Sequence, residues 1–300
     1  MMSWICPNCG ESLKALVPNN LEQTTTSTSG SKNSKSVACE NNHQFDIAKE
    51  GYINLLLANQ KNSKHPGDNK DMVVARRDFL NEGHYTPLVS NLADILLNHY
   101  LTENISEEII ICDAGCGEGY YLSEISKRLN DKSIQLHSYG IDISKPAIQK
   151  ASKRMKSNMS DYHHFAVASS YKIPLKTDSQ DATIQVFAPS NEDEIHRILK
   201  ADGIWIKVVP AQKHLFELKE LVYDTPQLHS QEEVNIENWE TLEKDTLEFN
   251  IELNTLASRL NLLMMTPFYW SISESKKEFL LDNLKSVTAS FQVIVLKNYE

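Results

Sequence analysis

The sequence lacks any apolar run that approaches the roughly 18 residues needed for a membrane-spanning helix. Its first residues, Met1 to Cys6, contain neither the basic stretch nor the apolar core of a signal peptide. These absences argue against a helical membrane protein and against a secreted one. We therefore expect a cytoplasmic location and no membrane partner.

Cysteine is scarce as well, with five in 300 residues. An odd, small number is poorly suited to the disulfide scaffold of a secreted domain. Because Cys6 and Cys9 form a C-x-x-C pair near the start of the chain, metal binding is favoured over a bridge.

The chain has no excess of basic residues, as its formal net charge of -10 shows. Taken alone, that charge argues against a nucleic-acid partner. Residues 1–85 are neutral, so the remainder of the chain carries the whole acidic excess. An RNA contact would then depend on a local basic cluster, formed by Lys61, Lys64, Lys70, Arg76 and Arg77.

The composition changes along the chain and predicts three parts. Residues 1–47 contain two Cys/His pairs around a low-complexity insertion at 19–36, which is rich in Thr, Ser, Asn and Gly and reads as a loop. Residues 48–104 read as a helical connector, with one helix capped by Asp71 and a second capped by Thr86. Residues 105–300 form the third part.

The third part alternates short β-rich runs with helical runs. This alternation predicts an α/β fold with a doubly wound, Rossmann-like sheet. The acidic stretch from Asp224 to about Leu260 does not fit the alternation and reads as an excursion or lid. Residues 287–296 read as one or two closing strands. The expected strands are 109–113, 135–143, 163–167, 182–187 and 203–209, and the expected helices are 120–129, 145–155, 192–199 and 213–223.

A glycine-rich turn follows the first of these strands. The strand ends at Asp113, and glycine then occupies every second position, at Gly115, Gly117 and Gly119. Glycine lets a backbone turn tightly and approach a ligand closely. The next strand ends at Asp142, where a carboxylate can accept hydrogen bonds from two ribose hydroxyls. This β–turn–α–β unit resembles the class I S-adenosylmethionine methyltransferase fold, although a plain strand-to-helix turn would show the same glycines.

Four residues near the start of the chain have the spacing of metal ligands. Cys6 and Cys9 form a C-x2-C pair, and Cys39 and His43 form a C-x3-H pair. Together they can fill a tetrahedral zinc shell with no open position, which predicts one structural zinc ion per chain. Reduced thiols without a metal remain the alternative.

The Cys/His quartet followed by the glycine-rich turn, together with specific sequence segments between and after them, resembles the RlmA family. The resemblance extends along nearly the whole chain. The segments that carry it are residues 45–56, 66–68, 75–80, 83–85, 167–170, 188–189, 214–219 and 265–270. The family's members methylate N1 of guanine in a hairpin of domain II of 23S rRNA. Three departures are a longer loop between the zinc pairs, Phe187 in place of a tyrosine, and the stretch from Asp224 to Leu260.

The resemblance implies a zinc ribbon held by Cys6, Cys9, Cys39 and His43. It implies that Tyr85, the turn at Gly117–Gly119 and His214 contact S-adenosylmethionine, and that a homodimer forms a cleft for the rRNA hairpin. Asp113 and Asp142 are interpreted as carboxylates that orient the cofactor. Glu118 lies close to the same site and is interpreted as a cofactor ligand.

The catalytic base is not identified by the sequence. N1 of guanine carries a proton near neutral pH, which some group must remove. Phe187 stacks on an extruded guanine in one interpretation and packs in the core in another. The aromatic segment Met265–Trp270 has two interpretations as well: it lines the substrate pocket, or it packs in the hydrophobic core. Two rival functions remain at this point: a methyltransferase for a small molecule, braced by the ribbon, and an RNA-binding protein with an inactive methyltransferase domain.

Overall fold

The computed structural model of the chain describes residues 3–16, 35–60, 67–101, 108–156, 162–230 and 238–298. The predicted insertion at 19–36 lies outside the described residues except for Lys35 and Ser36. Lys61 and Lys64 of the predicted basic cluster also lie outside them.

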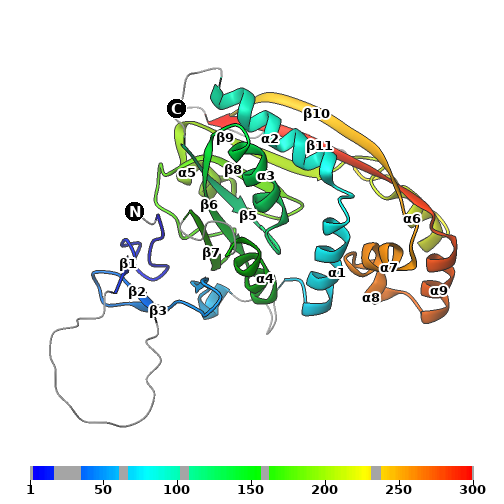
Figure 1. Ribbon diagram of the computed structural model, residues 1–300, viewed down its shortest axis with the longest axis horizontal. Coiled ribbons are helices and arrows are strands. Elements are labelled where there is room, and N and C mark those ends of the chain that lie inside the picture. The colour runs from blue at the N-terminus through cyan, green and yellow to red at the C-terminus, as the bar shows by residue number, and fades with distance from the viewer. Residues whose placement is uncertain are drawn as a thin grey trace, which may run out of the picture.

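The N-terminal module is a small antiparallel sheet of three strands in the order β1-β2-β3. These strands are β1 (Lys14–Ala15), β2 (Ser36–Ala38) and β3 (Gln44–Asp46). The module lies at one end of the long axis of the molecule, opposite the helices near the C-terminus (Figure 1).

The main body is built on an eight-stranded sheet with the order β10-β11-β9-β8-β5-β6-β7-β4. The six strands from β9 to β4 run parallel, and β11 and β10 are added antiparallel at one edge. The doubly wound prediction is confirmed by this order. The strands are β4 (Ile53–Asn54), β5 (Glu108–Ala114), β6 (Gln135–Asp142), β7 (His163–Val167), β8 (Gln180–Val186), β9 (Leu199–Pro210), β10 (Trp239–Glu252) and β11 (Ser286–Asn298).

Helices connect the strands and form a group of their own near the C-terminus. They are η1 (Ala58–Gln60), α1 (Lys70–Asn81), α2 (Thr86–Leu101), α3 (Tyr120–Asn130), α4 (Lys145–Met155), α5 (Glu192–Ile198), α6 (Phe216–Val222), α7 (Leu256–Met264), α8 (Phe268–Ser271) and α9 (Glu274–Asn283). The expected cap of α1 is wrong. Asn69, not Asp71, caps it, because its side chain accepts from the N–H groups of Asp71 and Met72. None of the described helices has both the length and the apolar character needed to cross a bilayer.

The two faces of the sheet are covered by different parts of the chain. Apolar side chains of α2, α3 and α4 pack on one face, where they meet β-strand residues such as Ile111 and Leu136. On the other face, Cys112 and Tyr139 pack with residues of α5 and with Trp4 of the N-terminal module. Since neighbouring residues of a strand point to opposite faces, Ile111 and Cys112 belong to different cores. The N-terminal module is therefore part of the packing of the main sheet.

The stretch from Asp224 to Leu260 was expected to be an excursion or lid. That expectation is wrong for most of its described length. It contains β10, which pairs antiparallel with β11 from Trp239 to Glu252, and the start of α7. Most side chains of β10 are exposed on both faces, so the strand has no apolar alternation that a sequence pattern would reveal. The closing run forms one strand, β11.

Candidate functional site

Three cysteines and a histidine of the N-terminal module converge on one point. Their ligand atoms all lie within 4.8 Å of one another. Sγ of Cys9 is 3.7 Å from Sγ of Cys39, and Nδ1 of His43 is 3.4 Å from Sγ of Cys39 and 3.5 Å from Sγ of Cys6. A tetrahedron with zinc–sulfur bonds of about 2.3 Å has S–S edges of about 3.8 Å and S–N edges of about 3.6 Å. The donor set and its spacing therefore fit a closed zinc site.

The metal cluster is attached to the main sheet by the first residues of the chain. The N–H of Ile5 donates to the carbonyl of Pro174 at 2.9 Å, and the N–H of Ser3 donates to the hydroxyl of Tyr139 at 2.9 Å. Between them Trp4 is buried and its ring lies edge-on to Tyr139, with the centroids 5.1 Å apart. A zinc ion held by Cys6 would thus sit two residues from this buried anchor.

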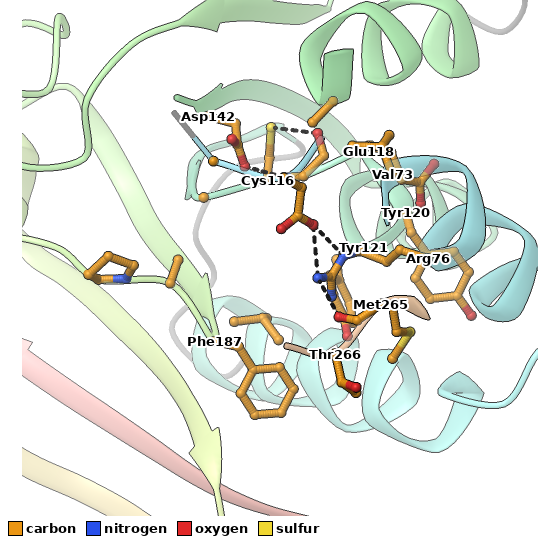
Figure 2. Close-up of a pocket in the computed structure, with 18 of the residues that line it drawn as sticks. Val73, Arg76, Cys116, Glu118, Tyr120, Tyr121, Asp142, Phe187, Met265 and Thr266 are labelled. Atoms are coloured by element: carbon orange, nitrogen blue, oxygen red, sulfur yellow. Dashed lines mark hydrogen bonds and ion pairs between the residues drawn. The ribbon is translucent and has the colours of Figure 1, made fainter. Parts of the chain in front are cut away.

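A cavity of about 580 Å3 opens at the carboxyl ends of the parallel strands. It lies where the strand order reverses between β5 and β8, the position at which open α/β sheets bind ligands. Figure 2 shows residues from α1, the glycine turn, β6, β8 and the turn before α8 around it. Six of the eight predicted cofactor residues line it, namely Tyr85, Gly115, Gly117, Glu118, Asp142 and His214.

The glycine turn is shaped by positive φ angles. Gly115 has φ +93°, and a Cβ at this position would lie 2.2 Å from the Cβ of Ala188. Gly117 has φ +54°, and a Cβ there would meet no atom of the described residues within 4 Å. Gly115 therefore permits close packing between two loops, whereas Gly117 leaves space on the cavity side.

Asp142 joins the end of β6 to this turn. Its carboxylate accepts from the N–H of Gly117 at 3.0 Å and from the N–H of Ser144 at 2.7 Å. Burial raises its pKa to about 6, although the two backbone N–H groups work in the opposite direction. The carboxylate lines the cavity, and each oxygen can accept a further hydrogen bond. The acid at the end of β6 and the glycine turn after β5 are therefore in direct contact, whereas the predicted role of Asp142 toward a ribose stays a prediction.

Glu118 lies in the wall of the cavity with a charged partner behind it. Arg154 of α4 donates from Nε and Nη2 to Oε2 of Glu118, at 3.0 and 2.6 Å. The other oxygen, Oε1, is buried and has no hydrogen-bond partner among the described residues. Burial raises the pKa of Glu118, and the charge of Arg154 opposes that shift. The carboxylate therefore has one oxygen held by an arginine and one unpaired acceptor.

Asp113 and Gly119 were predicted to contact the cofactor, but neither lines the cavity. Asp113 is buried, and burial together with the charge of Asp142 raises its pKa to about 8. Gly119 has φ +82°, and a Cβ there would lie 3.0 Å from the Cβ of Ala151 in α4. Asp113 precedes the turn in the buried end of β5, and Gly119 ends the turn against α4.

Tyr85 and His214 are far apart in sequence, but the rings of both pack against Phe291, with centroids 5.0 Å from it. The hydroxyl of Tyr85 is buried without a partner among the described residues, and burial raises its pKa. Burial lowers the pKa of His214 to about 3, helped by the nearby His229 and Lys219. Nδ1 of His214 lies 3.3 Å from the N–H of Ser290 and accepts from it. The imidazole is therefore neutral near pH 7, with its proton on Nε2.

Arg76 shows what sequence reasoning missed. It belongs to the basic cluster expected to contact RNA, but its guanidinium donates to Oδ2 of Asp68 at 3.0 and 2.9 Å and to the carbonyl of Met265 at 3.3 Å. It lines the cavity and ties α1 to the turn before α8. Met265 is far away in sequence, so no local pattern could have revealed this contact. Lys219 and Tyr171 also line the cavity without having been predicted.

Comparison with known proteins identifies the family. A family model described as "RlmA, N-terminal" matches residues 4–64, and one described as "Methyltransferase domain" matches residues 105–255. YxjB of Bacillus subtilis (strain 168), assigned by name to the 23S rRNA (guanine-N1-)-methyltransferases, is 32% identical over 268 residues, 87% of this chain and 90% of that protein. The chain belongs to the RlmA family. The expected fold, a class I methyltransferase domain preceded by a zinc ribbon, is thereby confirmed.

Two further comparisons give more partial matches. The 23S rRNA (guanine(748)-N1)-methyltransferase of Streptomyces fradiae is 32% identical over 71% of this chain and 65% of its own length. The solved structure of YcgJ from Bacillus subtilis has a TM-score of 0.45 and 14% identity, covering 69% of this chain and 98% of that one. The chain therefore combines a zinc ribbon, whose Cys3His cluster could hold the metal, with the domain of an S-adenosylmethionine-dependent methyltransferase.

Proposed function

We propose that this chain transfers a methyl group from S-adenosylmethionine to N1 of a guanine in 23S rRNA. The observation that carries the proposal is the pairing, on one chain, of a Cys3His ribbon with a cavity at the strand-order reversal. A relative named for this activity aligns with 87% of this chain and 90% of its own length, a span that includes both the ribbon and the cavity of this chain.

The residues of the cavity suit a nucleoside with a charged amino-acid tail. Asp142 stands where it can accept hydrogen bonds from the two ribose hydroxyls. Oε1 of Glu118 and the hydroxyl of Tyr85 are buried polar atoms without partners among the described residues, and a ligand would satisfy both. The neutral His214 donates from Nε2. We assign cofactor contacts to these four residues and to Gly115 and Gly117.

S-adenosylmethionine supplies a methyl group bonded to a positively charged sulfur. In the transfer, N1 of guanine bonds to the methyl carbon while the carbon–sulfur bond breaks and its electron pair stays on sulfur. The proton of N1 leaves to a base. The chain would contribute orientation, because the glycine turn and Asp142 would hold the cofactor in a cavity that Ala188 and Pro189 also line.

The acceptor is proposed to be a hairpin of domain II of 23S rRNA, which is bound by a homodimer in the cytoplasm. The family resemblance supports this part of the proposal. The acidic net charge of -10 means that contact must come from local surfaces. Light scattering of the purified chain tests the dimer directly, since a monomer at micromolar concentration would contradict it.

Primer extension across the hairpin tests the activity. Ribosomal RNA from a strain without the gene is incubated with the purified protein and S-adenosylmethionine. A methyl group on N1 blocks Watson–Crick pairing, so reverse transcription stops one nucleotide before it. A new stop that requires both protein and cofactor supports the proposal. No stop, with intact binding of S-adenosylmethionine by calorimetry, would assign the cavity to a small-molecule acceptor instead.

A further inference from the structure

The turn that follows β8 has an unusual backbone. Phe187 adopts φ +54°, in the left-handed region, although it is a bulky residue. Its N–H still donates to the carbonyl of Val208 at 3.0 Å, so it keeps a pairing typical of the strand before it. Left-handed backbone at a bulky side chain is unfavourable and persists only where the surroundings impose it.

Gln185 imposes that conformation from inside the sheet. Its side chain is buried, and Nε2 donates to the carbonyl of Ala188. Oε1 accepts from the hydroxyl of Ser190 at 3.0 Å and from Nε1 of Trp205 at 3.1 Å. One amide thus holds Ala188 and Ser190, on either side of Pro189, in the segment that directly follows Phe187.

Two further contacts hold the same segment from outside β8. The hydroxyl of Ser170, in the loop after β7, donates to the carbonyl of Pro189 at 2.5 Å. Ala188 touches the glycine turn so closely that a Cβ on Gly115 would overlap its own Cβ. The residue next to Phe187 is therefore in contact with the turn on the cofactor side of the cavity.

These contacts fix the position of the Phe187 ring. It lines the cavity and is 38% exposed. One side is supported by His214 and Phe291, whose ring centroids lie 5.2 and 5.6 Å away. Figure 2 shows Phe187 on the strand side of the cavity, with Met265 and Thr266 on the helical side. The core-packing interpretation is incomplete, because the ring keeps an open part toward the cavity.

We propose that Phe187 is the surface on which the acceptor guanine stacks, and that Gln185 is the positioning residue that holds it beside the glycine turn. This inference rests on the proposed function and assigns the base-binding part of the same cavity. An aromatic ring offers a planar apolar surface to a base at little loss of conformational freedom. The left-handed backbone at Phe187 directs the ring toward the cavity. An extended strand conformation at this residue would direct the ring elsewhere.

Three substitutions at one position test the stacking role. We expect kcat/KM for 23S rRNA to fall about 10- to 100-fold in Phe187→Leu and Phe187→Gly, because stacking on one base contributes that much, and to stay within about threefold in Phe187→Tyr. The dissociation constant of S-adenosylmethionine should stay within about threefold in all three. Phe187→Gly should melt at a higher temperature than Phe187→Leu, because glycine adopts positive φ freely.

Phe279→Leu is the matched control. Phe279 is an exposed phenylalanine of α9 that does not line the cavity, so kcat/KM should remain that of the wild type. Wild-type kcat/KM in Phe187→Leu would overturn the stacking role.

A double-mutant cycle tests Gln185. In Gln185→Glu a carboxylate oxygen replaces the amide nitrogen that donates to Ala188, while the acceptor for Ser190 and Trp205 remains. We expect about a tenfold loss of kcat/KM in the wild-type background and little further loss in the Phe187→Leu background. An equal loss in both backgrounds would overturn the positioning role. Wild-type protein that leaves 23S rRNA unmethylated would overturn the proposed function itself, whereas normal activity in every variant would overturn this inference alone.

Discussion

The zinc cluster and the cofactor cavity are assembled in different ways. The four zinc ligands come from two short turns, and each turn supplies two of them at C-x2-C or C-x3-H spacing. The cavity takes its walls from segments between Gly67 and Phe268, including α1, the glycine turn, the ends of β6 and β8, and the turn before α8.

The difference concerns what holds each site together. A bound zinc ion supplies free energy that a small three-stranded module cannot obtain from its own core. The cavity is held by backbone hydrogen bonds and close packing, such as those of Asp142 and Gly115. We therefore expect the ribbon to respond mainly to metal and the cavity to respond mainly to backbone changes.

Removal of the zinc should have the largest effect. Cys39→Ser takes one ligand from the closed shell, and structural zinc contributes on the order of 10 kcal/mol to folding in zinc-finger peptides. We expect bound zinc to fall from one ion per chain to none and the ribbon to unfold, with a red shift in the fluorescence of the buried Trp4. Binding of S-adenosylmethionine should change by less than about threefold.

Glu40→Gln is the control for that experiment. Glu40 is exposed in the same turn and pairs with Lys14 at 2.9 Å, so zinc content should not change. If Cys39→Ser loses cofactor affinity together with zinc, the ribbon and the cavity are coupled through β4 and β7. That result would contradict the expectation that the two regions respond to different changes.

Gly115→Ala should have the next largest effect. The added methyl group would overlap Ala188 and would also occupy a positive φ, so the free energy of unfolding should fall by about 3 kcal/mol. Cofactor binding should be lost as well. In Gly117→Ala the methyl group meets nothing among the described residues, and we expect a fall of about 1 kcal/mol. Urea denaturation compares the two, and equal losses would contradict the assignment of different roles to these glycines.

Asp142→Asn should weaken the cofactor without unfolding the ribbon. The amide has one acceptor oxygen where the carboxylate has two, and a hydrogen bond to a charged acceptor contributes about 2 kcal/mol, so affinity should fall about 30-fold. Because burial raises the pKa of Asp142 to about 6, wild-type affinity should also fall as the pH drops below about 6. Calorimetry at several pH values should show this dependence in the wild type and not in the variant.

Asp113→Asn should have the smallest effect at neutral pH. Burial raises the pKa of Asp113 from 3.8 to about 8, so the folded chain holds this proton more tightly than the unfolded chain does. Stability is therefore highest below pH 3.8 and falls as the pH rises toward about 8. Between pH 6 and 8 the wild type should lose about 2 kcal/mol relative to the variant, measured by denaturation. Parallel curves would show that Asp113 is ionised throughout.

Local patterns predicted those features whose determinants lie close together in sequence. The C-x2-C and C-x3-H pairs predicted the metal cluster, and the Gly115–Gly119 turn with Asp142 predicted where the cofactor site lies. The carboxyl ends of adjacent parallel strands meet at one edge of a sheet, and the N–H of Gly117 accordingly lies 3.0 Å from the carboxylate of Asp142, while the cofactor site itself stays a prediction.

Features that depend on distant partners escaped prediction. β10 has almost no buried face, so only its pairing with β11 makes it a strand. β4 is two residues long within the expected connector, yet it forms an edge of the main sheet by pairing with β7. Arg76 was assigned to an RNA-contacting basic cluster because its partner Met265 could not be inferred from sequence spacing.

The amino-acid sequence alone determined the chemistry available to this protein: a zinc donor set, an α/β alternation and a glycine turn with an acid at the end of the following strand. Only the tertiary structure decided which of those groups face a ligand. It kept Asp113 and Gly119 out of the cavity lining and brought Phe187 into it. The physical reason is that exposure and backbone strain depend on packing between distant segments, and a one-dimensional pattern does not contain that packing.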